Sequence, residues 1–564
     1  MHLLDWIILT ITLLSIVCYG IYRSKATSNL DGYFRGNKQL PWYLVLLSIM
    51  GTQASAITFI SGPGQAFNDG MRFIQYYFGL PLAMVVICVT FVPIFHKLNL
   101  YTAYEFLEKR FDKRTRTFAS IIFLVSRGLS TGISIVAPSI ILSSLFGWDI
   151  YITNIIMGGI LIIYTVKGGA KAVAYTQQLQ FVIIIAGMVL AGYYAVHLLP
   201  KGVGFANAID IANNVGKMNV ITTGITDKGS FNWNDKFNIF SGIIGGFFLA
   251  LSYFGTDQSQ VGRYITAKSV KESRVGLLLN GLLKIPMQFL ILLVGILVFS
   301  FYQYQKAPIN FNPKVTQQLL QSNQKDSATY YIESYTNTQT ILGEALQNKS
   351  PNTTIVYLQQ QLLQYKKGFA TIAKKANITT DVDDTNYVFL SFVTTYLPIG
   401  VVGLLIAMIF LAAWGSIAAA LNALASSSVI DLHKQYNSTV YTEKQEYIIS
   451  KKYTLAWGLF CIVAAQFATS MGSLIVAVNV LGSLFYGVML GLFLVAFFIP
   501  FIKSTAVFVS AIISQLAIFY IHFILHFKGF LWLNVIGVLL VIGIAFVLQL
   551  VLPVPKNVAS NTTP

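Results

Sequence analysis

The chain contains 564 residues, of which 55% are hydrophobic and 10% are charged. Soluble globular proteins carry about 25% charged residues, so this composition excludes a soluble domain and indicates a helical protein that crosses a membrane several times. The formal net charge of +17 does not indicate a nucleic-acid partner. The basic residues occupy short segments between apolar stretches, where they orient membrane spans.

Hydropathy along the chain predicts thirteen membrane-spanning helices. We place them at residues 3–22, 41–61, 73–96, 117–146, 149–166, 172–199, 237–262, 276–304, 398–430, 451–472, 474–502, 504–526 and 530–552. The first segment lacks a basic leader, which favours a retained helix over a cleaved signal peptide. The expected fold is therefore all-α and polytopic.

Basic residues concentrate in alternate connections between these spans. One set of connections contains Arg23, Lys25, Arg35, Lys38, Lys97, Lys109, Arg110, Lys113, Arg114, Arg116, Lys167, Lys171, Arg263, Lys268, Lys271, Arg274, Lys434, Lys444, Lys451 and Lys452. The other short connections contain only Arg72 and Lys528. Since basic loops remain in the cytoplasm, we expect the N-terminus outside and the C-terminus inside.

Two long polar segments, 200–236 and 305–387, fall on the exterior in this topology. The second is rich in Gln, Asn and Tyr, and a run near residues 355–365 predicts a surface helix. Neither segment carries a catalytic arrangement of side chains, and no enzymatic activity is predicted.

The segment 48–64 is apolar at both ends and polar in the middle. Its centre contains Gly51, Thr52, Gln53, Ser55 and Thr58. Unwound backbone at membrane depth survives only where protein buries it or where it lines a cavity, and interrupted spans mark binding sites in transporters with inverted repeats. The alternative is a close-packed helix whose glycines contact a neighbour, but this does not explain Gln53 and Thr58.

The span 117–146 has one polar face, formed by Arg127, Ser130, Thr131 and Ser134 at helical spacing. Arg127 lies about 15 Å from the cytoplasmic end, too deep for its guanidinium to reach water easily. It would therefore bind a carboxylate, either on a substrate or on a neighbouring side chain.

Lys284, Asp257 and Tyr253 are further polar residues within predicted spans. Lys284 is shallower than Arg127, so it either reaches toward the membrane surface or binds a ligand. Asp257 lies near the cytoplasmic end of its span, and an ion pair with Arg263 or another loop base is the simplest expectation. Tyr253, one turn earlier, is either a packing residue or an aromatic gate.

Several motifs together resemble the sodium/solute symporter family, which includes glucose, iodide, monocarboxylate, vitamin and sialic acid transporters. They are the polar segment 48–64, Y-F-R-G-N-K-Q-L-P-W at 33–42, Y-T-A-Y-E-F-L-E-K-R-F at 101–111, G-G-A-K-A-V-A-Y-T at 168–176 and the small-residue stretch 412–428. The resemblance covers about residues 3–525, apart from the exterior excursion.

The resemblance implies alternating access by ten core helices in two inverted five-helix repeats. The expected organisation is an extra helix and cytoplasmic loop at 1–40, a first repeat at 41–199, an exterior loop at 200–236, a second repeat at 237–502 with the insertion 305–387, and two C-terminal helices with a short tail at 503–564.

The resemblance also implies a sodium site. Its backbone carbonyls would come from Gly51, Ala54 and Ala412, and its hydroxyl from Ser416. Gly415 stands where other family members have a second serine, and Gln177 stands where they have an acidic residue. Alanines at 418 and 419 replace the serines of a second site in the sialic acid branch. We therefore expect one weakened Na+ site, in which water could supply a missing ligand.

The resemblance favours an anionic substrate over a sugar. Thr58, Tyr77 and Ala250 replace the glutamine, glutamate and asparagine of the sugar branch, although Lys284 and the gate-like Tyr253 match it. S-A-I-T at 55–58 resembles the sialic acid branch, whose serine and threonine hold a carboxylate. The arginine of that branch would fall at Ser130, one turn from Arg127. The expected substrate-binding set is Gln53, Ser55, Thr58, Tyr77, Arg127, Ser130, Thr131, Tyr253 and Lys284.

The sequence thus predicts a sodium-coupled symporter of a small organic anion, such as a sialic acid, monocarboxylate or vitamin, in a plasma or bacterial inner membrane. Its partners would be the solute and the lipid bilayer, with no nucleic acid, and a monomer is compatible with the sequence. The alternatives are a sugar or polyol symporter, a proton-coupled or cation-independent carrier, and a membrane sensor on a transporter scaffold.

Overall fold

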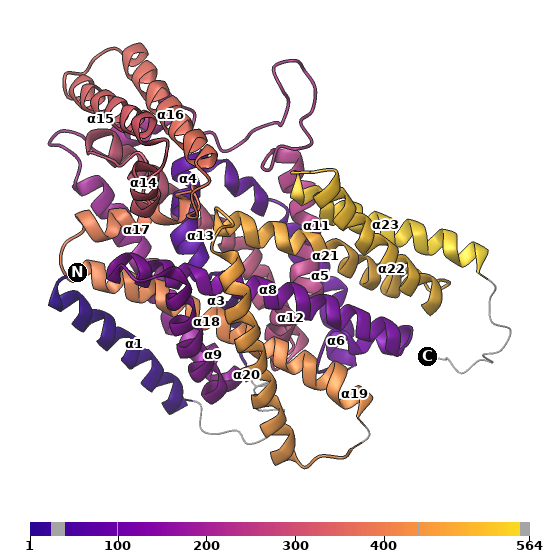
Figure 1. Cartoon of the computed structure of the whole chain (residues 1–564). Helices are drawn as coiled ribbons and strands as arrows, with labels where there is room; N and C mark the ends of the chain where they lie inside the picture. Colours follow the sequence, from indigo (N-terminus) through magenta and orange to yellow (C-terminus); the bar gives the residue numbers. More distant parts are fainter. Residues whose placement is uncertain (24–39, 99, 438, 553–564) are drawn as a thin grey trace.

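The computed structural model describes residues 1–23, 40–98, 100–437 and 439–552, which form helices joined by turns, with no β-strand among them (Figure 1). Most of the motif at 33–42, the cytoplasmic loop expected after the first helix and the C-terminal tail expected after residue 552 lie outside the described residues.

Nine helical segments of the described chain are long and apolar enough to cross a membrane. They are Ala56–Lys97, Lys113–Phe146, Tyr175–His197, Val270–Tyr304, Val401–Tyr436, Glu443–Ala468, Leu474–Phe498, Ser504–Ile524 and Phe530–Val551, and four shorter apolar helices cover Leu3–Ile16, Trp42–Gln53, Ile150–Val166 and Ser241–Thr256. Each expected span overlaps one of these segments. The all-helical membrane class is confirmed, whereas the count of thirteen crossings stays a prediction.

Two expected spans are joined without a loop. We predicted separate helices at 149–166 and 172–199, but one helix, α9 (Ile150–His197), runs through both. The connection around residues 167–171 continues the helix because its glycines and alanines do not force a turn, unlike a proline. The predicted boundary there is therefore wrong, although the two apolar segments are those expected.

Helix α18 (Val401–Ser427) lies at the centre of the bundle, and α9, α8 (Lys113–Phe146) and α20 (Glu443–Ala468) pack around it. Its small residues, such as Ala412, Gly415 and Ala418, are all buried. Without bulky side chains, helix backbones approach closely and gain van der Waals contact. The small-residue stretch 412–428 thus lies in the tightly packed interior of the bundle.

The insertion 305–387 forms a helical cap with its own small core. It contains α14 (Pro313–Leu320), α15 (Lys325–Gln347) and α16 (Asn352–Lys375), followed by α17 (Thr385–Tyr396). Figure 1 shows α15 and α16 side by side, projecting beyond the rest of the helices. The surface helix predicted near residues 355–365 is part of α16. The sequence did not predict its partner α15, whose buried residues pack against it.

At the opposite side of the molecule, α22 (Ser504–Phe519) and α23 (Phe530–Val551) pack against α21 (Leu474–Phe498), as the yellow helices of Figure 1 show. The N-terminal helix α1 (Leu3–Arg23) packs on α18 instead. Its Asp5 accepts hydrogen bonds from the backbone N–H groups of Gly400 and Gly403. Helices α1, α22 and α23 contribute no residue to the polar cavity described below, which is lined by other helices of the bundle.

Candidate functional site

The first interrupted helix is where the polar segment 48–64 predicted it. Helix α3 (Trp42–Gln53) ends, Ala54 and Ser55 adopt non-helical backbone angles, and α4 (Ala56–Asp69) begins. The ψ angles of 79° and 172° at these two residues break the helical hydrogen-bond ladder. The first N–H groups of α4 consequently have no partner within their helix and favour negative charge nearby. The predicted break is confirmed.

A second interruption was not predicted. The span expected at 237–262 divides into η3 (Ser241–Gly245), α11 (Gly246–Thr256) and α12 (Gln258–Tyr264). Asp257 separates α11 from α12 with φ −78° and ψ 117°, and its Oδ1 accepts hydrogen bonds from the N–H and hydroxyl of Ser259. Aspartate is a favoured N-cap residue, so Asp257 within an apolar span could have located the break.

A cavity of about 110 Å³ lies between the two breaks. Its walls come from α3, α4, α8, α11, α12, α18, α21 and the 3-10 helix η2 (Gly70–Tyr77). Eight predicted residues line it, namely Gln53, Ser55, Thr58, Tyr77, Arg127, Ser130, Thr131 and Tyr253. Hydroxyl and amide groups predominate among these side chains. The structure thus brings the predicted polar residues together, and their contact with a solute stays a prediction.

Arg127 makes an ion pair inside the protein. Its Nε lies 3.1 Å from Asp257 Oδ2, its Nη2 contacts the same oxygen, and Nη2 also donates to the Tyr486 hydroxyl at 2.9 Å. The Asp257 side chain is 1% exposed and that of Arg127 is 11% exposed. A buried charge needs such a partner because desolvation is costly. The expected pairing of Asp257 with Arg263 or another loop base is therefore wrong.

Arg263 is buried as well, and its Nη2 donates to the Ala419 carbonyl at 3.2 Å. Helix α12 turns the Arg263 side chain toward α18, whereas Asp257 lies at the helix break, opposite α8. The geometry of the break therefore selects Arg127 as the partner of Asp257.

Three tyrosines complete the cavity near Arg127. The Tyr253 ring lies 5.3 Å from the guanidinium carbon and 5.8 Å from the Tyr486 ring. The Tyr253 hydroxyl accepts a hydrogen bond of 2.6 Å from Gln260 of α12. Tyr76 donates to Asn479 of α21 at 3.0 Å. Tyr253 is thus tied across the α11–α12 break, and its action as a gate stays a prediction.

Lys284 does not line the cavity. It belongs to α13 (Val270–Tyr304), its side chain is fully buried, and Nζ lies 5.5 Å from the centre of the Tyr77 ring. No hydrogen-bond partner of Nζ occurs among the described residues. The expectation that Lys284 is shallow and could reach the membrane surface is wrong, because its side chain is fully buried against Tyr77 of η2.

Two residues of the predicted sodium site, Gly51 and Gly415, lie on either side of one amide side chain, that of Gln177. Gln177 Nε2 donates to the Gly415 carbonyl at 3.1 Å and to Thr52 Oγ1 at 3.3 Å. Gln177 Oε1 accepts from Ser48 at 3.0 Å. A Cβ atom at Gly51 would lie 3.1 Å from the Gln177 side chain. This amide presents N–H donors where a cation requires oxygen atoms.

Ser416 is the predicted side-chain ligand, and it also lines the cavity. Its hydroxyl donates to the carbonyls of Ala412 at 2.8 Å and Ala413 at 3.2 Å. A Cβ atom at Gly415 would lie 2.5 Å from Gln180 Oε1. Gln177 and Gln180 thus use the space that a larger residue at position 415 would need. The donor set of Gly51, Ala54, Ala412, Gly415 and Ser416 fits a sodium ion only in part.

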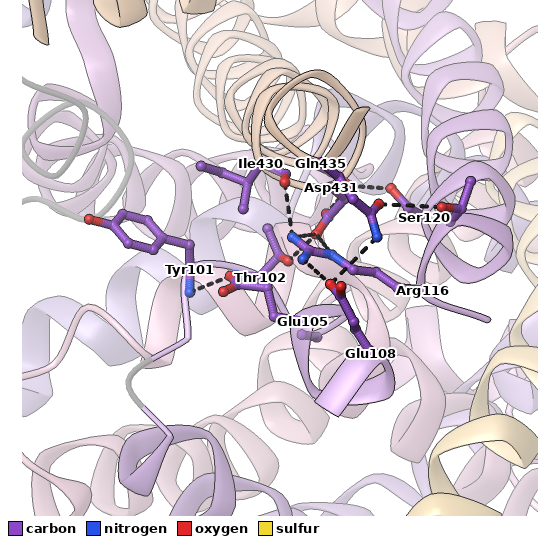
Figure 2. Close-up of polar contacts among 12 residues, drawn as sticks. Tyr101, Thr102, Glu105, Glu108, Arg116, Ser120, Ile430, Asp431 and Gln435 are labelled. Carbon is purple, nitrogen blue, oxygen red and sulfur yellow. Dashed lines mark hydrogen bonds and ion pairs between the residues drawn. The ribbon is translucent and has the colours of Figure 1, made fainter. Parts of the chain in front are cut away.

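A second polar cluster joins α8 to the segment that follows α18. Figure 2 shows Arg116 of α8 between Glu108 and Asp431. The two ion-pair distances are 2.6 Å to Glu108 and 2.8 Å to Asp431. Asp431 also accepts hydrogen bonds from Thr102 and Ser427, at 2.6 and 2.7 Å. Arg116 was predicted as an orientation signal alone, yet it links α8, which carries Arg127, to the helical turn η4 (Ser428–His433) after α18.

Two cavity residues of α21 were not predicted from the sequence. Asn479 and Tyr486 lie seven residues apart on this helix and both line the cavity. Such spacing places two side chains on one helical face, and polar groups on one face of an apolar span indicate a lumen or a partner. The same rule that found Arg127 could have found them.

Comparison with known proteins gives the family. The sequence model described as "Sodium:solute symporter family" matches residues 33–332 and 352–514. The sodium/sialic acid symporter SiaT of Proteus mirabilis is 26% identical over 511 residues, which covers 90% of this chain and 87% of that protein. The human sodium/iodide cotransporter is 29% identical over 276 residues, covering 48% of this chain and 41% of that protein.

A sodium-coupled monocarboxylate transporter from Homo sapiens is 25% identical over 89% of this chain and 70% of its own length. Among solved structures, a substrate-bound, outward-open Na+-coupled sialic acid symporter superposes with a TM-score of 0.75, covers 98% of both chains and is 24% identical. This likeness shows the shared fold. The match of the family model over most of the sequence shows that the chain belongs to the sodium:solute symporter family of multi-pass membrane transporters.

Proposed function

We propose that this transporter carries a small organic anion together with sodium, by alternating access around the cavity between the two helix breaks. The observation that carries the proposal is the position of Ser55, Thr58 and Arg127 on one cavity at the start of α4. Free N–H groups at a helix start and a guanidinium both stabilise a carboxylate. Relatives named for sialic acid and monocarboxylates support this class of solute.

The Arg127–Asp257 pair limits how the anion binds. Since Asp257 already neutralises Arg127, the cavity has no net charge from this pair. We infer that the solute carboxylate contacts Ser55, Thr58 and the α4 N–H groups, and that it shares the guanidinium with Asp257. The same neutrality favours, as the second candidate, a sugar or polyol held by hydroxyl and amide groups.

Sodium is proposed as the coupling ion, with a weakened site. The relatives named above are sodium-coupled, and Ser416 with nearby carbonyls could supply oxygen ligands. The Gln177 amide competes for the Gly415 carbonyl and supplies no negative charge. One charge crossing about 100 mV provides roughly 2.3 kcal/mol, or close to fifty-fold accumulation. Proton coupling or cation-independent transport is the alternative.

The topology is proposed as two inverted repeats, at 41–199 and 237–502, with the N-terminus outside and the C-terminus inside a plasma or bacterial inner membrane. Support comes from the interruption of the first helix of each repeat, at Ala54 and at Asp257. Paired breaks of this kind place a binding site at the repeat interface. A monomer can contain this site, because one chain supplies all the cavity walls described here.

The decisive experiment is uptake into proteoliposomes of labelled N-acetylneuraminate, pyruvate and glucose, with sodium or with potassium outside. We expect saturable uptake of at least one of the two anions, a modest increase with sodium, and loss of uptake in Arg127→Ala. Arg127→Lys should also transport poorly, since an ammonium lacks the two-point geometry of a guanidinium. Uptake of glucose alone would favour the sugar candidate, and anion uptake unchanged in Arg127→Ala would refute the assigned role of Arg127.

A further inference from the structure

The exterior cap encloses a second cavity against the membrane helices. This cavity measures about 50 Å³ and lies where α4, α13, α15 and α16 meet the exterior segment 200–236. One lining residue, Leu363, is 40% exposed, so the cavity lies close to the exterior surface. Its volume would hold only a few water molecules, which excludes a large organic solute and favours a small ion.

One wall of this cavity carries a buried ammonium group with one hydrogen-bond acceptor in the part of the chain that the structure describes. Lys217 is 7% exposed, and its Nζ donates to the backbone carbonyl of Asn68 at 2.9 Å. Nζ lies 4.7 Å from the centre of the Phe299 ring. An ammonium has three N–H donors, and a buried charge without an ionic partner is costly. Two of the three N–H donors of Lys217 therefore have no hydrogen-bond acceptor among the described residues.

The opposite wall carries a second lysine, which comes from the cap. Lys366 of α16 has a side chain that is 25% exposed, and its Nζ lies 3.0 Å from Asp384 Oδ2. It also lies 5.5 Å from the ring centres of Phe67 and Phe311. Two lysines from segments about 150 residues apart thus line one small aromatic cavity.

The nearby carboxylates do not neutralise both lysines. Asp384 pairs with Lys366, and Asp69 accepts a hydrogen bond from Gln65, without an ion pair to Lys217 among the described residues. The cavity also contains an unsatisfied acceptor, Oε1 of Gln359, whose residue is 2% exposed. A water molecule could donate one hydrogen to this oxygen and the other to an anion.

We propose that this exterior cavity binds one small monovalent anion, either chloride or a short carboxylate such as acetate, between Lys217 and Lys366. The anion supplies the negative charge that Lys217 lacks and joins the cap to the membrane helices. The insertion 305–387 thereby gains a role, because it contributes Lys366. This site lies at the outer end of α4, about 15 Å along the helix from Thr58, and it goes beyond the transport function proposed above.

The test measures anion binding to the purified full-length protein at constant sodium and ionic strength. Chloride or acetate replaces gluconate, which is too large for the cavity, and the thermal unfolding midpoint and calorimetric affinity are recorded. We expect chloride, acetate or both to raise the unfolding midpoint until it saturates. Comparison of the two titrations shows which of the two anions binds more tightly. Lys366→Gln and Lys217→Gln should each weaken binding by roughly tenfold or more, because each loses a charge-assisted hydrogen bond.

Lys367→Gln is the matched control, since it removes the same charge from the next, exposed position of α16. It should bind the anion as the parent does. The titration is repeated in Arg127→Ala, so that binding at the central cavity is distinguished from binding at the exterior cavity. Equal anion responses in the parent, Lys366→Gln and Lys217→Gln would overturn the proposal, as would a response that disappears only in Arg127→Ala.

Discussion

Arg127 and Asp257 lie 130 residues apart in sequence and share an ion pair at the edge of the central cavity. The pair joins the polar face of α8 to the break between α11 and α12. A conformational change that moves these helices relative to each other must therefore carry the pair along or separate its charges. A solute carboxylate is the natural competitor for the same guanidinium.

Replacing Asp257 by Asn should make the thermal stability of the protein depend on bound solute. The change leaves a buried guanidinium without a countercharge, and we expect a stability loss of about 3 kcal/mol. A saturating anion that binds the freed Arg127 should recover part of this loss. The measurement is the thermal unfolding midpoint with and without N-acetylneuraminate or pyruvate.

The control for this change is Asp235→Asn, which alters an acid in a partly exposed ion pair with Arg72. It should lower stability less and should not change the response to the solute. Equal stabilisation of the parent and Asp257→Asn by every anion tested would show that the solute does not compete for Arg127.

Sodium dependence should respond to the amide of Gln177. Gln177→Asp replaces a donor that contacts the Gly415 carbonyl with a carboxylate, and sodium should bind roughly tenfold more tightly through one added charged contact. Ser416→Ala should remove the sodium stimulation of uptake. Gly415→Ser by itself should do little, because its Cβ would meet Gln180 Oε1 at 2.5 Å.

The measurement is the sodium concentration that gives half-maximal uptake in proteoliposomes. Gln178→Asp places the same charge one residue away, at a half-buried position outside the Gln177 hydrogen bonds, and should leave this concentration unchanged. If Gln177→Asp and Gln178→Asp behave alike, the position of the amide does not determine sodium affinity.

The cluster around Arg116 should stabilise the fold far more than an exposed ion pair does. Asp431 is fully buried, and Asp431→Asn breaks its pair with Arg116, so we expect a loss of about 3 kcal/mol. Lys434→Gln removes a partly exposed partner of Glu446 and should cost under about 1 kcal/mol. Chemical unfolding in detergent micelles would compare the two variants, and similar losses would contradict the proposed importance of the buried cluster.

Anion binding at the exterior cavity should weaken in alkaline solution. Burial lowers the pKa of Lys217 to about 8, with repulsion from Lys366 adding to the effect and attraction from Asp69 opposing it. Below pH 8 the ammonium is charged in both the folded and the unfolded protein. As the pH rises through 8, the folded protein loses this charge, and chloride affinity should fall roughly fivefold between pH 8 and pH 9.

The stability of the anion-free protein should change in the opposite direction. Between pH 8 and the ordinary lysine pKa of 10.5, the unfolded chain binds more protons at Lys217 than the folded protein does, so stability rises with pH. Lys217→Gln should abolish both trends. The other charged groups at the cavity, Lys366 and Asp384, form an ion pair with each other. Calorimetry at pH 7, 8 and 9 tests the prediction, and a constant chloride affinity would contradict it.

The sequence by itself determined the membrane class, the positions of the apolar segments and the break near Ala54. Each of these depends on local chemistry. Lipid requires continuous apolar helices with satisfied backbone groups. A polar interruption such as Gln53 to Thr58 can therefore be recognised from the sequence of that segment alone. The polar face of α8 followed from helical spacing in the same way, and its residues do line one cavity.

Only the tertiary structure decided which polar groups meet. Asp257 is the ion-pair partner of Arg127, Gln177 lies between Gly51 and Gly415, and Lys284 is buried beside Tyr77. These contacts join helices that are far apart in sequence, and their side chains meet because of how the helices pack. Hydropathy and spacing show that a buried charge needs a partner, whereas the packing of distant helices selects that partner.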